Sequence, residues 1–169
     1  MDSLQEAIRT REASWIVAQS MGQLHYALDV ALSVAPPEKR GGSFCLMNAD
    51  NSDVPCLVVL NVGHVAQDKK GKYWTFAQEK ANRLKRWTMD VSSWQSRNPS
   101  AEQWGGAVRG KRFIHSFSGF PEALDEAMML FHAMVSEDMT VEEAEAIANI
   151  SNNEFFSTMR YQFGALKRK

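Results

Sequence analysis

The N-terminal part of the chain has the apolar spacing of a helix that packs on one face. Residues 3–34 contain no proline and open with strong helix formers. Apolar residues then recur at the helical spacing i, i+3, i+4, i+7 and i+8, at Leu24, Ala27, Leu28, Ala31 and Leu32. We expect Gly22 to divide the stretch into two segments and Pro36 to end it, so residues 1–35 form N-terminal helices.

Two apolar runs after these helices predict a β-hairpin. They cover residues 43–47 and 55–62, and the polar segment 48–53 between them has turn residues. The second run is apolar at nearly every position, so we expect both faces of that strand to be covered. Residues 67–72 are polar and are expected to form a loop.

A further helix is predicted over residues 73–89. One stripe follows the helical period, at Trp74, Ala77, Ala81, Leu84 and Thr88. Basic residues fill other positions, which we interpret first as a solvated face formed by Lys80, Arg83, Lys85 and Arg86. Residues 92–106 have the Ser, Asn, Pro and Gly of a loop, and residues 111–117 alternate as a strand does.

The C-terminal part predicts three more helical segments. Pro121 stands where a first helical residue would stand, before a regular apolar stripe. Thr140 and Glu143 form a capping box before a short helix that residues 151–153 interrupt. The last segment carries an apolar stripe at Phe155, Phe156, Met159 and Phe163. Because one small core hides few such rings, we expect this stripe to be exposed and to make the chain a homo-oligomer.

The order of helices, hairpin, helix, strands and helices indicates an α+β fold. We expect a single domain over residues 1–169, with residues 140–169 as a helical C-terminal extension. The chain has 44% hydrophobic and 23% charged residues, which excludes a disordered or fibrous protein. With 19 basic and 20 acidic residues, nucleic acid is an unexpected partner. No apolar run of about 18 residues and no signal-peptide pattern occur, so no membrane association and a cytoplasmic location are expected.

The sequence contains few residues arranged for known catalytic chemistry. The histidines are scattered without zinc-ligand spacing, at His25, His64, His115 and His132. No GxSxG, P-loop or GxGxxG motif occurs. Cys45 and Cys56 lie in the two strands of the predicted hairpin and could pair only if the strands brought them together. Two free, buried thiols in a reducing compartment are the expectation.

An ordered series of short motifs begins at Phe76. It comprises an aromatic residue, a lysine, an asparagine, an arginine–aromatic pair, Ser-Ser, Gly-Gly and Ser-Gly-x-Pro, at Phe76, Lys80, Asn82, Arg86-Trp87, Ser92-Ser93, Gly105-Gly106 and 118–121. This order resembles an uncharacterised branch of the HbpS/GlcG-like family, also called the heme-degrading domain family. The resemblance covers about residues 23–133, and Glu126 stands where the family has a histidine.

The resemblance implies an HbpS/GlcG-like, profilin-like fold, which is an antiparallel sheet of about five strands with helices on both faces. It implies assembly into homo-oligomers and, for some members, heme binding through ligands that no shared motif identifies. We therefore expect a non-enzymatic, oligomeric binding or scaffold protein, with a small anionic ligand such as heme. The alternative is a heme-degrading or other small-molecule enzyme.

The motif residues define a candidate ligand site, which consists of Lys80, Arg86, Ser92, Ser93, Ser118 and Gly119. The helix start after Gly119 offers backbone N–H groups, and the two basic residues offer positive charge, which together suit a carboxylate or propionate. The alternative is that these residues only fix a turn and a helix start. Lys80 and Arg86 point about 120° apart on a helix, so they can share a ligand only if both side chains bend to one edge. No catalytic or metal-binding residue is assigned.

Overall fold

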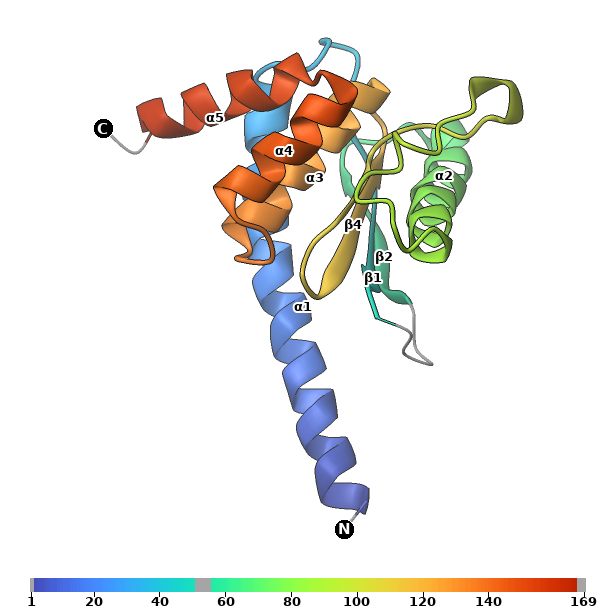
Figure 1. Ribbon diagram of the computed structural model, residues 1–169, viewed down its shortest axis with the longest axis vertical. Helices are drawn as coiled ribbons and strands as arrows, with labels where there is room; N and C mark the ends of the chain where they lie inside the picture. Colours follow the sequence, from blue (N-terminus) through green and yellow to red (C-terminus); the bar gives the residue numbers. More distant parts are fainter. Residues whose placement is uncertain (1, 51–55, 167–169) are drawn as a thin grey trace.

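The computed structural model describes residues 2–50 and 56–166, which form one sheet and five α-helices (Figure 1). In chain order the elements are α1 (Asp2–Leu32), β1 (Gly41–Asn48), β2 (Cys56–Gly63), α2 (Gln67–Arg86), the 3-10 turn η1 (Pro99–Ala101), β3 (Ala107–Arg109), β4 (Phe113–Ser118), α3 (Glu122–Val135), α4 (Val141–Ser151) and α5 (Glu154–Leu166). Helix α2 covers one face of the sheet, and α1 and α3 lie on the other with α4 and α5 beside α3. The α+β prediction is confirmed.

The sheet has the strand order β2-β1-β4-β3, and all neighbouring strands are antiparallel. The described residues form four strands where about five were expected. A short stretch pairs with β3 without forming a full strand. Ser92 forms an isolated β-bridge with Val108, and the Ser93 N–H donates to the Ala107 carbonyl over 2.9 Å. The loop predicted over residues 92–106 therefore supports the sheet edge through this short pairing.

The two faces of the sheet carry separate apolar cores. The larger core joins β1 and β4 to α1, α3, α4 and α5. The smaller core lies beneath α2 and consists of Cys45, Met47, Ala77, Ala81, Leu84, Ala107 and Ile114. Strand β1 is buried from Gly41 to Met47, whereas β2 is half-buried over most of its length. Residues of β2 pack against both cores, Leu57, Val58 and Leu60 against the larger and Cys56 and Val59 against the smaller, as predicted for a strand covered on both faces. The cover is incomplete, because β2 lies at the sheet edge and β1 occupies the inner position.

Helices α1 and α2 both differ from the prediction. Helix α1 runs unbroken through Gly22, which is exposed, and its N-terminal half projects from the rest of the chain (Figure 1). One glycine costs a helix only about 1 kcal/mol, so an exposed Gly22 does not divide it. Helix α2 begins at Gln67, so the segment 67–72 is its first part rather than a loop. None of the described helices has both the length and the apolar character needed to cross a membrane.

The C-terminal helices agree with the prediction in extent but not in exposure. Thr140 accepts a hydrogen bond from the Glu143 N–H, and the Glu143 carboxylate accepts one from the Thr140 N–H, which completes the predicted capping box. In α5, however, Phe156 and Met159 are buried in the larger core, and Phe163 packs against it. The expectation of an exposed stripe is wrong, because α3 and α1 provide the surface that covers it.

Candidate functional site

A pocket with aromatic walls lies where the start of α2 meets the turn between β4 and α3. We call it the aromatic pocket; its volume is about 400 Å³. Its lining residues are Lys39, Tyr73, Phe76, Lys80, Trp104, Ser118, Gly119, Phe120, Pro121, Glu122 and Asp125. The sequence motifs thus place Lys80, Ser118 and Gly119 at one pocket, although they come from different elements.

A buried ion pair forms the inner wall of the aromatic pocket. Lys80 Nζ donates to Asp125 Oδ2 over 2.9 Å and to the Phe117 carbonyl over 2.9 Å, and both charged side chains are only 2% exposed. Burial raises the pKa of Asp125 to about 6, although the nearby Lys80 ammonium opposes this shift. Gly106, with φ 119°, lies against the pair, and a Cβ at that position would be 2.8 Å from Lys80 Nζ.

Asp125 also fixes the turn that leads into α3. Its Oδ1 accepts the Phe120 N–H over 2.9 Å, and the Gly119 N–H hydrogen-bonds to the same carboxylate. The Phe120 N–H directly follows Gly119, where an anionic ligand was expected to bind. The protein's own carboxylate therefore occupies this position, and the charge on Lys80 is matched inside the fold.

Two further lysines contact aromatic side chains of the pocket, Lys39 as a lining residue and Lys72 from the neighbouring turn of α2. Lys39 Nζ donates to the Tyr73 hydroxyl over 3.3 Å, and Lys72 Nζ lies 5.3 Å from the ring centre of Phe76. Neither lysine forms an ion pair with a carboxylate of the described residues. The pocket's other carboxylate belongs to Glu122. Burial would raise its pKa, but hydrogen bonds from Arg97 and from the Gly105 N–H bring it below the usual value.

Three of the predicted site residues lie outside the aromatic pocket. Arg86 lines a separate hollow of about 430 Å³ near the C-terminal end of α2, together with Asn82, Trp87 and Arg97. Ser92 and Ser93 are fully buried, and Ser93 Oγ accepts the Ala107 N–H over 2.9 Å. Lys80 and Arg86 therefore open to different hollows, so the prediction that they clamp one anion is wrong.

The basic face of α2 is solvated only in part: Arg86 is exposed and Lys85 is half-buried, but the first interpretation is wrong for the other two residues. Lys80 and Arg83 are both buried. The Arg83 guanidinium donates to the carbonyls of Ser93 and Ser96 over 2.8 and 2.9 Å and to the Trp104 carbonyl over 2.5 Å. Arg83 thus shapes the loop that carries one aromatic wall of the pocket. No sequence pattern could have predicted this role, because a buried and an exposed arginine have the same helical spacing.

Glu126 is a second buried carboxylate next to the pocket wall. Its oxygens accept hydrogen bonds from the hydroxyls of Ser92 and Ser151 and from Asn153 Nδ2, the last over 2.7 Å. Burial raises the pKa of Glu126, and the three donors oppose that shift. Glu126 thus connects the loop before β3 to the junction of α4 and α5, and it does not line the aromatic pocket.

A series of hydrogen-bonded polar side chains is buried in the larger core, away from the aromatic pocket. His115 Nε2 lies 2.9 Å from Asp138 Oδ2, His115 Nδ1 lies 2.9 Å from His132 Nδ1, and His132 Nε2 lies 3.0 Å from the Ser20 carbonyl. The carboxylate and the carbonyl accept only, so the facing nitrogens of both rings carry protons. Burial and the neighbouring His115 lower the pKa of His132 to about 3, which keeps that ring neutral.

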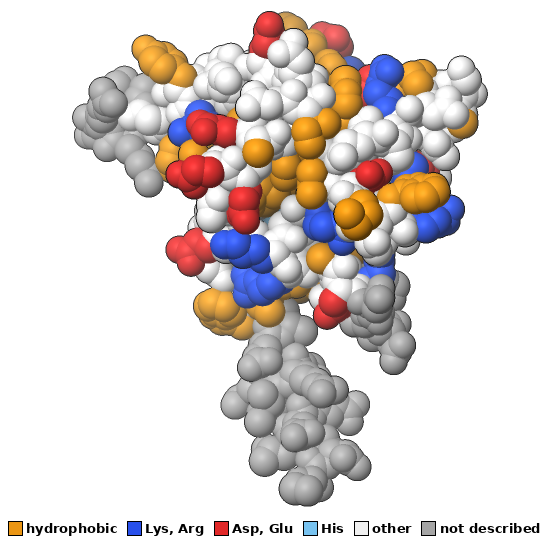
Figure 2. Space-filling view, viewed as in Figure 1, with side chains coloured by type: hydrophobic (Ala, Val, Ile, Leu, Met, Phe, Trp, Pro, Cys, Tyr) orange, Lys and Arg blue, Asp and Glu red, His pale blue; other side chains and the backbone are white. Residues whose placement is uncertain are grey.

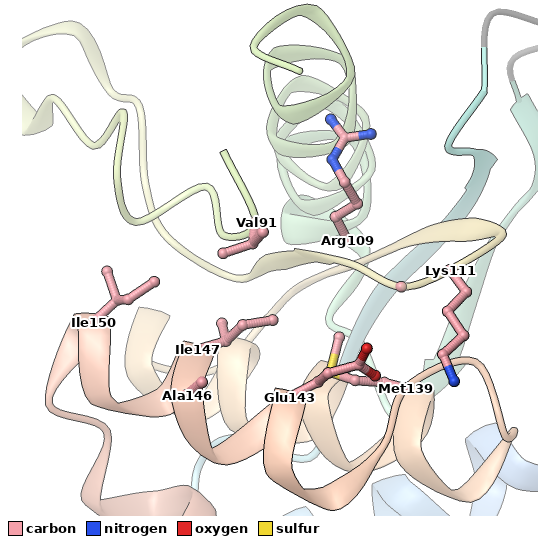
Figure 3. A pocket seen from close by; sticks show the side chains of 9 residues that line it. Val91, Arg109, Lys111, Met139, Glu143, Ala146, Ile147 and Ile150 are labelled. Carbon is pink, nitrogen blue, oxygen red and sulfur yellow. The ribbon is translucent and has the colours of Figure 1, made fainter. Parts of the chain in front are cut away.

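An apolar groove lies between α4 and the segment around β3 (Figure 3). Its volume is about 370 Å³, and its lining residues are Val91, Arg109, Gly110, Lys111, Met139, Glu143, Ala146, Ile147 and Ile150. Ile147 and Ile150 extend from α4 toward the segment that carries Val91. The Arg109 guanidinium donates to the carbonyls of Ala49, Asp90 and Leu84, so it is already bonded within the fold. The aromatic pocket, with free cations beside aromatic rings, is the better candidate site.

The donor groups of the aromatic pocket do not fit heme. Heme iron takes an axial ligand from a side chain such as histidine, cysteine, methionine or tyrosine. Tyr73 is the only such side chain among the lining residues, and its hydroxyl bonds to Lys39. Across the described residues, no cluster of three or more His, Cys, Asp or Glu side chains could hold a metal ion. No protein-family model, curated protein or solved structure matches the chain.

Proposed function

We propose that the protein binds a small organic anion with an aromatic or other flat apolar body in the aromatic pocket. The observation that carries this proposal is the combination of aromatic walls with Lys39, a lining lysine that has no carboxylate partner among the described residues. A second such lysine, Lys72, lies against the ring of Phe76, which lines the pocket. Both carboxylates of the pocket have their own cationic partners, Lys80 for Asp125 and Arg97 for Glu122, so the charge of Lys39 is not matched by a carboxylate of the pocket. A ligand carboxylate would exchange water for a charge-assisted hydrogen bond while its body covers apolar side chains.

A binding role is favoured over a catalytic one by the state of the pocket's ionisable groups. Lys80 and Asp125 bond to each other and to backbone groups, which leaves neither as a free nucleophile or general base. The remaining lysines lie at the entrance, where they can hold a ligand's charge. We also propose that the protein is cytoplasmic and that it is related to the HbpS/GlcG-like family. Kinship is supported by Gly106, Ser118 and Gly119, motif residues that meet around Lys80.

Titration with the fluorescent aromatic sulfonate 8-anilinonaphthalene-1-sulfonate tests the proposal. Binding to the wild-type chain should be saturable, and Lys39→Gln should weaken it about tenfold, the loss of one charged hydrogen bond. Ile150→Ser in the apolar groove is the matched control and should leave the affinity unchanged. The proposal fails if Ile150→Ser abolishes binding while Lys39→Gln has no effect.

Hemin provides a separate test of the alternative enzyme. The proposal predicts no specific Soret band when hemin is added, because the pocket lacks a suitable axial ligand. A Soret band that disappears with reductant would instead support heme degradation.

Self-association is also retained as a proposal. The α5 stripe no longer supports it, but other large apolar side chains are exposed, among them Trp15 at 64% and Trp87 at 56%. Light scattering at micromolar concentration should give at least the mass of a dimer, and a monomer mass would contradict the proposal.

A further inference from the structure

The β1–β2 hairpin brings the two cysteines of the chain to the same face of the sheet. In the strand register Cys45 pairs with Val59 and Met47 pairs with Cys56, so the cysteines are diagonal neighbours. Both contribute to the smaller core beneath α2, where Cys45 is buried and Cys56 is half-buried. The expectation of two buried thiols is thus met only by Cys45. The two thiol groups are within hydrogen-bonding contact.

A β-bulge creates this arrangement. Side chains alternate between faces along a strand, so Cys56 and Val59, three positions apart, would face opposite sides of a regular strand. The register shifts by one residue opposite Leu46 and Met47, which makes Leu57 the extra residue of β2. Leu57 and Val58 both pack against the larger core. The bulge therefore turns Cys56 to the face that carries Cys45, and such bulges are specific features of a fold.

We propose that Cys45 and Cys56 form a redox-active dithiol that a low-molecular-weight disulfide converts to an intrachain disulfide across the hairpin. With oxidised glutathione, the Cys56 thiolate attacks one sulfur and expels a glutathione thiolate. The Cys45 thiol then loses its proton and attacks the Cys56 sulfur, which expels the second glutathione thiolate. The protein loses two electrons and two protons, and the oxidant becomes two molecules of glutathione.

The different surroundings of the two thiols set the order of these steps. Cys56 is half-buried and can meet an oxidant from solution, whereas Cys45 is fully buried beneath α2. Burial, together with the nearby Cys56, raises the pKa of the Cys45 thiol, which makes it a poor first nucleophile. Its contact with Cys56 makes the second, intramolecular attack its available reaction.

The full-length reduced protein, treated with oxidised glutathione and quenched in acid, tests the proposal by intact mass and non-reducing peptide mapping. The expected product is a monomer that has lost two hydrogens, contains a peptide joined through Cys45 and Cys56, and is restored by dithiothreitol. An unchanged mass, a lasting glutathione adduct on Cys56 or a disulfide-linked dimer would each overturn the proposal. These results are independent of whether the aromatic pocket binds an anion.

Two variants separate the roles of the thiols. Cys45→Ala should stop at the glutathione adduct on Cys56, and Cys56→Ala should remain unmodified. If either variant fails to fold, thermal unfolding of the wild-type chain still decides the question. The bond would close the segment 45–56 and should raise the melting temperature by about 5–10 °C. A lower melting temperature after oxidation would show that the hairpin cannot accommodate the bond.

Discussion

Replacing Lys80 with methionine should destabilise the protein strongly, although the residue belongs to a helix with a basic face. Lys80→Met keeps the length of the side chain but removes the cation that lies 2.9 Å from Asp125. Both side chains are 2% exposed, so water does not replace the lost partner. Removing one member of such a pair costs about 3–5 kcal/mol of the free energy of unfolding. Lys72→Met, an exposed change on the same helix, should stay within about 0.5 kcal/mol.

The pH dependence of this loss identifies its cause. Asp125 has a pKa of 3.8 in the unfolded chain and about 6 in the folded protein. A carboxyl group whose pKa is raised in this way contributes stability that is fully present below its unfolded pKa and is lost as the pH rises through its folded pKa. Without Lys80 the carboxyl stays protonated over a wider range. The deficit of Lys80→Met should therefore shrink by about 1 kcal/mol between pH 7 and pH 5.

Urea unfolding followed by tryptophan fluorescence measures these differences, and a double-mutant cycle tests the pairing itself. Asp125→Asn keeps an acceptor for the Phe120 N–H but leaves the Lys80 ammonium unpaired. The double variant Lys80→Met/Asp125→Asn should be more stable than the sum of the single losses predicts, by at least about 2 kcal/mol. Additive losses, each below about 1 kcal/mol, would refute the conclusion that a buried ion pair holds the pocket wall.

Three further measurements test other parts of the fold. The pKa of His132 is lowered to about 3, so this residue contributes stability that is present above its unfolded pKa of 6.5 and is lost as the pH falls. The difference in unfolding free energy between the wild type and His132→Leu should therefore shrink by about 2 kcal/mol from pH 7 to pH 5. Thr140→Ala should cost about 1 kcal/mol in urea unfolding, since it removes the capping bond to the Glu143 N–H, and Thr140→Ser should restore most of that loss. Phe156→Ala should cost about 3–5 kcal/mol because the ring is 1% exposed, whereas Tyr161→Ala, at 80% exposed on the same helix, should cost little; equal losses would contradict the packing of α5.

Helix starts and turns could be predicted from the sequence, because a few neighbouring residues determine them. The capping box at Thr140 fixed the start of α4, and the turn residues in the segment 48–53 separated the two hairpin strands. The same patterns could not say that β2 lies at the sheet edge, because an edge strand and a central strand can be equally apolar. The position of a strand is decided by pairing between distant segments, as when β1 pairs with β4.

The candidate site shows the same division between local and long-range information. The motif spacing selected Lys80, Ser118 and Gly119, which do meet at one pocket, but it also selected Arg86, which does not. Spacing alone cannot separate Lys80 from Arg86, since each is a basic residue on one helix. What separates them is Asp125, which reaches Lys80 from α3 and stabilises its burial.

Asp125 also explains why a ligand would be held at the pocket mouth rather than at the helix start. A free anion would have to displace a carboxylate that already accepts hydrogen bonds from Lys80 and from the Phe120 N–H. At the mouth, the Lys39 ammonium donates to the Tyr73 hydroxyl and has no carboxylate partner among the described residues. Binding there adds a charge-assisted hydrogen bond without breaking an existing ion pair. Lys39→Gln should therefore reduce anion affinity without the loss of stability that Lys80→Met causes, and a variant pair with the reverse behaviour would place the ligand against Asp125 instead.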